Sequence, residues 1–182
     1  FGTEADLVEL VNLCHERNIK LILDLAINHT SNSHEWFVNF KEARMNGDTD
    51  NPYYDYYSCV TTAEKLGGVQ YQKIAGVDCW YECNFSGGMP ELNFDNPEVR
   101  KAALDVAKHY LDLGIDGFRC DAADFVPFDF WKQCCDSLRA IPDHKLLLLA
   151  EGKRKDHFDA GFEMNYAWDY LAATRAVFNG GR

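Results

Sequence analysis

The chain has 182 residues, of which 47% are hydrophobic and 14% aromatic, enough for one domain with a buried core. Its formal net charge of -11 and pI near 4.9 argue against a nucleic-acid partner, because phosphate contacts need clustered Lys and Arg. No apolar run approaches the roughly 20 residues that span a bilayer, so the sequence predicts no membrane segment.

The first predicted elements are a helix and a buried strand. Apolar residues at helical spacing predict a helix from about Glu4 to Arg17, which Asn18 closes. The aliphatic run over residues 19–26 predicts a buried strand, with Asp24 near its end. Residues 27–30 then form the exit loop of this strand.

Residues 31–91 lose the alternation of strand and helix and are expected to form a small subdomain inserted on one loop. A short helix is predicted over residues 35–45, and turn residues follow it. The rest of the insert is expected to lack regular structure. Its high aromatic content, which includes Trp80 and four tyrosines between residues 53 and 57, argues against disorder.

Three of the seven cysteines, Cys59, Cys79 and Cys83, lie in this insert. They could form one disulfide or a metal site. The chain contains no Cys-x-x-Cys pair, which argues against zinc. The odd cysteine count and low density exclude a disulfide scaffold.

After the insert, helices and strands alternate strictly. This pattern predicts a parallel sheet with right-handed crossovers. The expected elements are a helix from Pro97 to about residue 113, a strand containing Arg119 and Asp121, a helix over 127–138, a strand ending at Glu151, a short strand over 160–164, and a helix containing Trp168, Leu171 and Val177.

Two of these strands end in an acidic residue. Side chains alternate along a strand, so Arg119 and Asp121 point the same way. A nearby guanidinium favours the ionised carboxylate, as a nucleophile requires. Glu151 follows a block of aliphatic residues, and desolvation there would raise its pKa toward what a general acid needs. Single acids at strand ends are often helix caps, but two at matching strand ends favour a functional site.

In parallel barrels the residues at the carboxyl ends of successive strands converge on one mouth. Asp24, Asp121 and Glu151 are three such residues, and His29 lies just beyond the first. Two carboxyl groups about 5 to 5.5 Å apart across a glycosidic bond would give retaining hydrolysis, with one as nucleophile and the other as acid and then base. The residues assign these two roles only weakly.

At these positions the chain resembles the alpha-amylase family of glycoside hydrolases. The first conserved block of the family is similar to Asp24-Leu-Ala-Ile-Asn-His29, the second to Gly117-Phe-Arg-Cys-Asp-Ala-Ala123, and the third to Leu149-Ala-Glu-Gly152. An additional block resembles Met89-Pro-Glu-Leu-Asn93. The order and spacing of all four blocks fit, over nearly the whole chain.

The resemblance implies a role for each matched residue. Asp121 would be the nucleophile, Glu151 the acid and base, and Arg119 the residue that orients and ionises Asp121. His29 would bind the sugar beside the cleavage point, and Asp24 would also belong to the substrate-binding residues and would support the arginine and the nucleophile. Aromatic residues of the insert, Trp80 among them, would stack on sugar rings or pack the insert's own core. The substrates would be alpha-glucans or maltooligosaccharides.

The chain also departs from the family pattern. Many members carry a histidine or lysine shortly after the nucleophile, where this chain has Asp124-Phe-Val126. The chemistry requires no cofactor; a structural calcium, to which Asn28 would contribute in many members, stays open. The fourth block, which supplies a third catalytic carboxylate, has no counterpart.

The predicted fold is α/β, a partial (β/α)8 barrel comprising about strands 3 to 6. Residues 1–30 and 92–182 would form the partial catalytic barrel, and 31–91 the inserted subdomain. Four strands leave two open sheet edges, so we expect the chain to be an internal piece that pairs with the remainder of its own barrel and has little activity alone.

Two other functions are compatible with a fold of this class. A non-catalytic relative that binds glycans or a partner would have no physical reason to keep Arg119, Asp121 and Glu151 together. A metal-dependent hydrolase would need histidines in ligand spacing at a strand end, and the sequence has no such pair.

Overall fold

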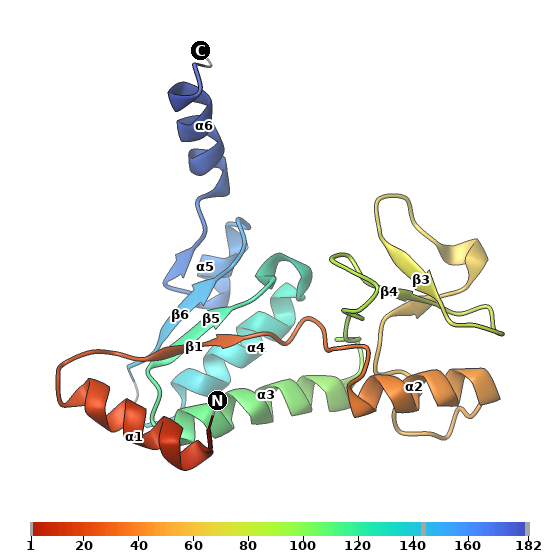
Figure 1. Ribbon diagram of the computed structural model, residues 1–182, viewed down its shortest axis with the longest axis horizontal. Coiled ribbons are helices and arrows are strands. Elements are labelled where there is room, and N and C mark those ends of the chain that lie inside the picture. Colours follow the sequence, from red (N-terminus) through yellow and green to blue (C-terminus); the bar gives the residue numbers. More distant parts are fainter. Residues whose placement is uncertain (1, 143–144, 181–182) are drawn as a thin grey trace. The chain divides into compact units, whose positions relative to one another are not determined.

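The computed structural model describes residues 2–142 and 145–180, and the chain divides into two compact units (Figure 1). The first unit comprises Phe1–Leu25 and Leu104–Arg182, and the second comprises Ala26–Ala103. The second unit therefore extends beyond the predicted insert at both ends. The division into a catalytic barrel and an inserted subdomain stays a prediction.

The first unit contains a four-stranded parallel sheet. Its strands are β1 (Ile22–Leu25), β5 (Gly117–Cys120), β6 (Leu147–Ala150) and β7 (Met164–Asn165), and they lie in the order β1-β5-β6-β7. Helices lie between β5 and β6 and between β6 and β7 in the chain, as in successive βα units. The α/β class and the parallel sheet are confirmed. Phe118 of β5 and Leu148 of β6 are buried, as strands covered on both faces require.

The helices follow their sequence signals closely. Thr3 forms the capping box of α1 (Glu4–His15), and Asn18 adopts a left-handed φ of 56° that ends it. The amphipathic α4 (Phe128–Arg139) buries one face, from which the Trp131 indole donates a hydrogen bond to the Ala123 carbonyl. The other helices of the first unit are α5 (Asp156–Ala160), α6 (Trp168–Phe178) and part of α3 (Pro97–Asp112). None of the described helices has the length and hydropathy of a membrane span.

The predicted strand over residues 160–164 is wrong in its position. Ala160 ends α5, and Gly161 caps that helix with a left-handed φ of 116° and an N–H that donates to the His157 carbonyl. The strand, β7, begins only at Met164 and is two residues long. The pair Gly161-Phe162 therefore marks a helix end, which the apolar pattern alone did not reveal.

The second unit contains more regular structure than the sequence predicted. After α2 (Glu35–Asn46), the strands β2 (Cys59–Val60), β3 (Tyr71–Lys73) and β4 (Trp80–Glu82) form an antiparallel sheet in the order β2-β4-β3. These strands have two or three residues each, too few for alternation to be visible in the sequence. The described part of the chain also contains two short 3-10 helices, η1 (Thr62–Glu64) here and η2 (Ala123–Phe125) in the first unit.

Buried aromatic residues form the core of this second unit. The ring of Tyr57 packs against the rings of Phe37 and Phe40, and its hydroxyl lies 2.6 Å from the Thr30 hydroxyl. At least one tyrosine of the aromatic cluster is therefore structural. All seven cysteines are free thiols, so the disulfide that the sequence left open for Cys59, Cys79 and Cys83 is not formed.

A buried carboxylate secures the amino-terminal end of the sheet. Asp116, just before β5, accepts hydrogen bonds from His15 Nε2 at 2.8 Å, Lys20 Nζ at 2.9 Å and the Leu21 N–H at 2.8 Å. Burial alone would raise the pKa of Asp116. The hydrogen bonds have the larger combined effect and lower the pKa below its ordinary value. The cluster joins the α1–β1 connection to β5.

We expect Asp116→Asn to lower the free energy of unfolding by about 1 to 3 kcal/mol, because the Lys20 ammonium loses its charged partner and His15 and the Leu21 N–H lose a charged acceptor. A group whose pKa is depressed in the folded state stabilises above its unfolded pKa, so this loss should be full at neutral pH and shrink below about pH 3.8. Urea unfolding at pH 7 and pH 3 measures both effects. An equal loss at both pH values would contradict the charge explanation.

Candidate active site

Two acidic residues lie side by side at the carboxyl ends of neighbouring strands. In the β5–β6 register Cys120 pairs with Ala150, so Asp121 and Glu151 are the next pair. The Glu151 N–H donates to the Cys120 carbonyl at 2.9 Å, and the Asp121 N–H donates to the Leu25 carbonyl of β1 at 3.0 Å. Adjacent strands are about 4.8 Å apart. Both carboxyl groups therefore lie at the edge of the sheet that is formed by the carboxyl ends of its strands, as the sequence predicted.

One guanidinium connects three carboxylates at this edge. Arg119 Nη1 lies 2.5 Å from Asp121 Oδ1 and 2.7 Å from Asp24 Oδ1, and Nη2 lies 2.6 Å from Glu151 Oε1. Burial alone would lower the pKa of Arg119, but its hydrogen bonds to Asp24, Tyr166 and Asp121 raise it well above the usual value. The arginine is a permanent cation that fixes the three acids relative to one another.

The surroundings of Glu151 differ from the sequence prediction. Leu148 and Ala150 before it are buried, whereas its carboxylate contacts Arg119 and accepts a hydrogen bond from the Ala122 N–H at 3.0 Å. Its side chain is 26% exposed, close to the 25% of Asp121. The two acids therefore share one polar, half-buried environment, and burial does not distinguish their roles.

A strained residue follows Asp121. Ala122 has a left-handed conformation, φ 49° and ψ 37°, which costs a non-glycine residue roughly 1 to 2 kcal/mol. This turn directs the Ala122 N–H toward Glu151 Oε2, and the next N–H, of Ala123, donates to the Glu151 carbonyl at 3.0 Å. The strain therefore serves to fix the Glu151 residue at both its side chain and its main chain.

Sequence reasoning missed Tyr166. This residue directly follows β7, and its hydroxyl accepts a hydrogen bond from Arg119 Nε at 3.3 Å. The Tyr166 N–H donates to the Gly152 carbonyl at 3.0 Å. The rule that identified Asp121 and Glu151 would have identified Tyr166 as well, had the strand been placed at 164–165 instead of 160–164.

Of the three predicted substrate-binding residues, His29 and Trp80 belong to the second unit and Asp24 belongs to the first. His29 forms an isolated bridge with Glu91, and its ring lies 5.8 Å from that of Phe85. Trp80 donates a hydrogen bond to the Thr62 hydroxyl, and Lys65 Nζ lies 3.7 Å from its ring centroid. Lys65 thus covers one face of the indole. Sugar binding by His29 and Trp80 stays a prediction.

Calcium binding at Asn28 stays a prediction. Calcium takes six to eight oxygen ligands, usually with several carboxylates. Asn28 is buried, and its carbonyl accepts a hydrogen bond from the Leu92 N–H. Over residues 2–142 and 145–180, no three His, Cys, Asp or Glu side chains gather in a way that could hold a metal ion.

A buried histidine lies behind the Glu151 loop. His157 is 0% exposed, and neither ring nitrogen has a hydrogen-bond partner among the described residues. Burial lowers its pKa below the ordinary 6.5; the Asp124 carboxylate, 3.7 Å from Nε2, opposes this and the charge of Arg154 adds to it. The imidazole is therefore neutral at pH 7.

Because His157 is buried, we expect the free energy of unfolding to fall in acid. Its pKa is lower folded than unfolded, so below about pH 6.5 the unfolded chain binds more protons and stability falls as the pH falls. We expect wild type to lose up to about 1.4 kcal/mol per pH unit more than His157→Phe between pH 6.5 and 5. Urea unfolding of both proteins at pH 7.5, 6 and 5 tests this. Parallel pH dependences would contradict it.

A family model and several known proteins match most of this chain in sequence. The family model for the alpha-amylase catalytic domain matches residues 1–171. Alpha-amylase 3 of Dictyoglomus thermophilum is 40% identical over 151 residues, which are 79% of this chain and 29% of that protein. Oligo-1,6-glucosidase of Bacillus cereus is 38% identical over 135 residues, 69% of this chain and 23% of that protein.

A solved structure extends the match to the fold. Eubacterium rectale Amy13B superposes with a TM-score of 0.81 and 28% identity, over 93% of this chain and 35% of the other. The chain thus spans about a third or less of the length of these three proteins.

Proposed function

Because the chain belongs to the alpha-amylase family, we propose that it supplies the nucleophile and the acid and base of a retaining glycosidase that cleaves alpha-glucosidic bonds. The observation that carries this proposal is the pairing of Asp121 and Glu151 at adjacent strand ends under one arginine. The names of the relatives, an alpha-amylase and an oligo-1,6-glucosidase, support starch-like glucans or maltooligosaccharides as substrates.

In the first step, a carboxylate oxygen of Asp121 attacks the anomeric carbon while Glu151 gives its proton to the glycosidic oxygen. The bond to the leaving sugar breaks, and a glycosyl ester on Asp121 forms. In the second step, Glu151 takes a proton from water, the water oxygen attacks the same carbon, and the ester bond to Asp121 breaks. Arg119 stabilises the Asp121 carboxylate before it attacks and again when the ester bond breaks.

Glu151 must exchange partners during this cycle. It shares Arg119 with Asp121 in this structure, and a protonated carboxyl cannot accept a charged hydrogen bond as well as a carboxylate does. We infer that a sugar bound between the acids separates Glu151 from Arg119 and leaves the guanidinium to Asp121 and Asp24. The Ala122 N–H would then remain as the fixed contact of Glu151.

A covalent trap tests the proposal in a complete barrel. We define the amylase chimaera as the Dictyoglomus alpha-amylase with its matching segment replaced by this chain. A fluorinated alpha-glucosyl fluoride, whose intermediate hydrolyses slowly, should add one glucosyl mass to the peptide containing Asp121. A folded chimaera without any adduct would contradict the catalytic proposal and favour the alternative of a glycan-binding, non-catalytic relative.

A further inference from the structure

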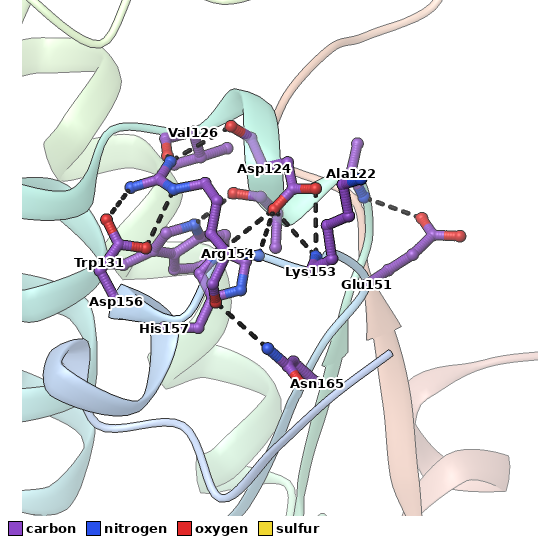
Figure 2. Close-up of polar contacts among 11 residues, drawn as sticks. Ala122, Asp124, Val126, Trp131, Glu151, Lys153, Arg154, Asp156, His157 and Asn165 are labelled. Atoms are coloured by element: carbon purple, nitrogen blue, oxygen red, sulfur yellow. Dashed lines mark hydrogen bonds and ion pairs between the residues drawn. The ribbon is translucent and has the colours of Figure 1, made fainter. Parts of the chain in front are cut away.

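A third acid, Asp124, binds the main chain that follows Glu151. It lies three residues after Asp121, in η2. Its two carboxylate oxygens accept hydrogen bonds from the Lys153 N–H, each at 3.2 Å, and Oδ1 also accepts from the Arg154 N–H at 3.2 Å (Figure 2). Successive N–H groups that converge on one carboxylate form a small anion-binding nest.

The contact between the two loops is reciprocal. Arg154 Nη1 donates to the carbonyl oxygens of Asp124 and Val126, both at 3.2 Å. Asp156 orients this guanidinium from the other side, with Nε–Oδ1 at 3.0 Å and Nη2–Oδ2 at 2.7 Å. Figure 2 shows these contacts gathered on one side of the Glu151 loop. The loop after β5 and the loop after β6 are therefore bound to each other in both directions.

The close approach of Asp124 depends on a glycine. A Cβ on Gly152 would lie 2.4 Å from Asp124 Oδ1 and 2.7 Å from its Cγ. It would also lie 2.7 Å from His157 Cε1. Any side chain at position 152 would push the carboxylate away from the two N–H groups. Only glycine lets Asp124 reach the main chain next to Glu151.

The main chain that carries Asp124 is held in place by its neighbours. The buried ring of His157 lies behind its carboxylate, and the Ala123 carbonyl is bound by the Trp131 indole of α4. The main chain next to Asp124 is therefore already fixed by its hydrogen bond to α4. A rigid support of this kind can determine the position of the loop that it binds.

We propose that Asp124 is a positioning residue for Glu151, and this inference rests on the proposed role of Glu151 as acid and base. The β6 ladder fixes Glu151 from the residue before it, and Asp124 fixes it from the two residues after Gly152. Without Asp124 the second restraint is lost, although every group of Glu151 is still present. Misplacement of a reacting group by about 1 Å can cost a hundredfold in rate.

A positioning residue differs in its kinetic effects from a residue that merely stabilises the fold or binds substrate. Loss of a substrate contact would raise KM, and loss of stability would reduce the amount of folded enzyme without changing kcat per folded molecule. Loss of positioning lowers kcat and leaves KM nearly unchanged. The amide of asparagine retains one acceptor oxygen for the two N–H groups. Asp124→Asn should therefore keep most of the kcat that Asp124→Ala loses.

The kinetic test uses Asp124→Ala, Asp124→Asn and Asp136→Ala in the amylase chimaera. Asp136 is the matched control because its carboxylate binds Lys132 on the surface of α4. We expect Asp124→Ala to lower kcat about 30- to 100-fold with KM within about twofold. Asp124→Asn should stay within about threefold of wild type, and Asp136→Ala should match wild type. An unchanged kcat, or a rise in KM alone, would overturn the proposal.

Amide exchange provides a measurement that does not depend on activity. In Asp124→Ala the N–H groups of Lys153 and Arg154 should exchange roughly five- to tenfold faster than in wild type, while those of β6 stay protected. If Asp124→Ala does not fold, Gly152→Ala displaces the same carboxylate and should give the same kcat and exchange changes. Unchanged exchange at both amides overturns the proposal. A folded but inactive wild-type chimaera would instead refute the proposed function, and exchange would still decide the role of Asp124.

Discussion

Replacing Asp121 with asparagine in the amylase chimaera is expected to lower kcat by at least about a thousandfold, as removal of a nucleophile does in other enzymes. The substitution keeps the volume of the side chain and an oxygen for Arg119, so the sheet edge should remain folded. It removes the charge that attacks the anomeric carbon. Initial rates on a maltooligosaccharide, normalised to folded protein, measure the effect.

Glu151→Gln provides the matched comparison, because the two acids should respond differently to the leaving group. A substrate with a good leaving group needs no proton from Glu151, so its first step should proceed in Glu151→Gln and the glycosyl ester should accumulate on Asp121. Asp121→Asn should be inactive on both kinds of substrate and form no ester. Activity of Asp121→Asn within tenfold of wild type would rule out Asp121 as the nucleophile.

Gly117→Ala is expected to destabilise the fold severely, by about 4 kcal/mol or more. A Cβ on Gly117 would lie 2.0 Å from the Leu147 carbonyl oxygen and 2.8 Å from the Leu147 nitrogen, and these main-chain atoms cannot move without breaking the β5–β6 pairing. The residue also has a φ of +150°, which side chains rarely adopt. Strand β5 carries Arg119, and Asp121 follows directly after it.

Urea unfolding of the 182-residue chain measures this loss. Gly67→Ala is the control, because a Cβ there meets nothing within 4 Å and should change stability by less than about 0.5 kcal/mol. A folded Gly117→Ala protein with the unfolding midpoint of the control would show that the β5–β6 register can shift to accommodate a methyl group.

The sequence predicted which residues lie at the carboxyl ends of β5 and β6 because the signals for them are local. An aliphatic run followed by an acid identified the ends of β5 and β6, and the two-residue spacing of Arg119 and Asp121 predicted their ion pair, which the structure shows. Four parallel strands follow from the alternation of elements. Each of these inferences needs only the geometry of one strand and the rule that parallel strands end together.

What the sequence did not reveal depends on contacts between distant residues. The hydrogen bonds from Lys153 and Arg154 to Asp124 join residues about thirty positions apart, and no spacing rule links them. Glu151 was placed in an apolar environment because its neighbours along the chain are aliphatic, yet its neighbours in space are Arg119 and Ala122. Local hydropathy describes the strand interior and says little about the side chain at its end.

The cluster around Asp116 lies at one end of β5 and the candidate catalytic cluster lies at the other. Asp121 lies five positions after Asp116 along extended chain, a distance of roughly 16 Å, which is beyond the range over which mutational effects usually couple. Changes at the two ends should therefore combine additively. Stability gained around Asp116 can offset destabilising substitutions that alter specificity around Asp121, so this strand allows new activities to evolve without loss of the fold.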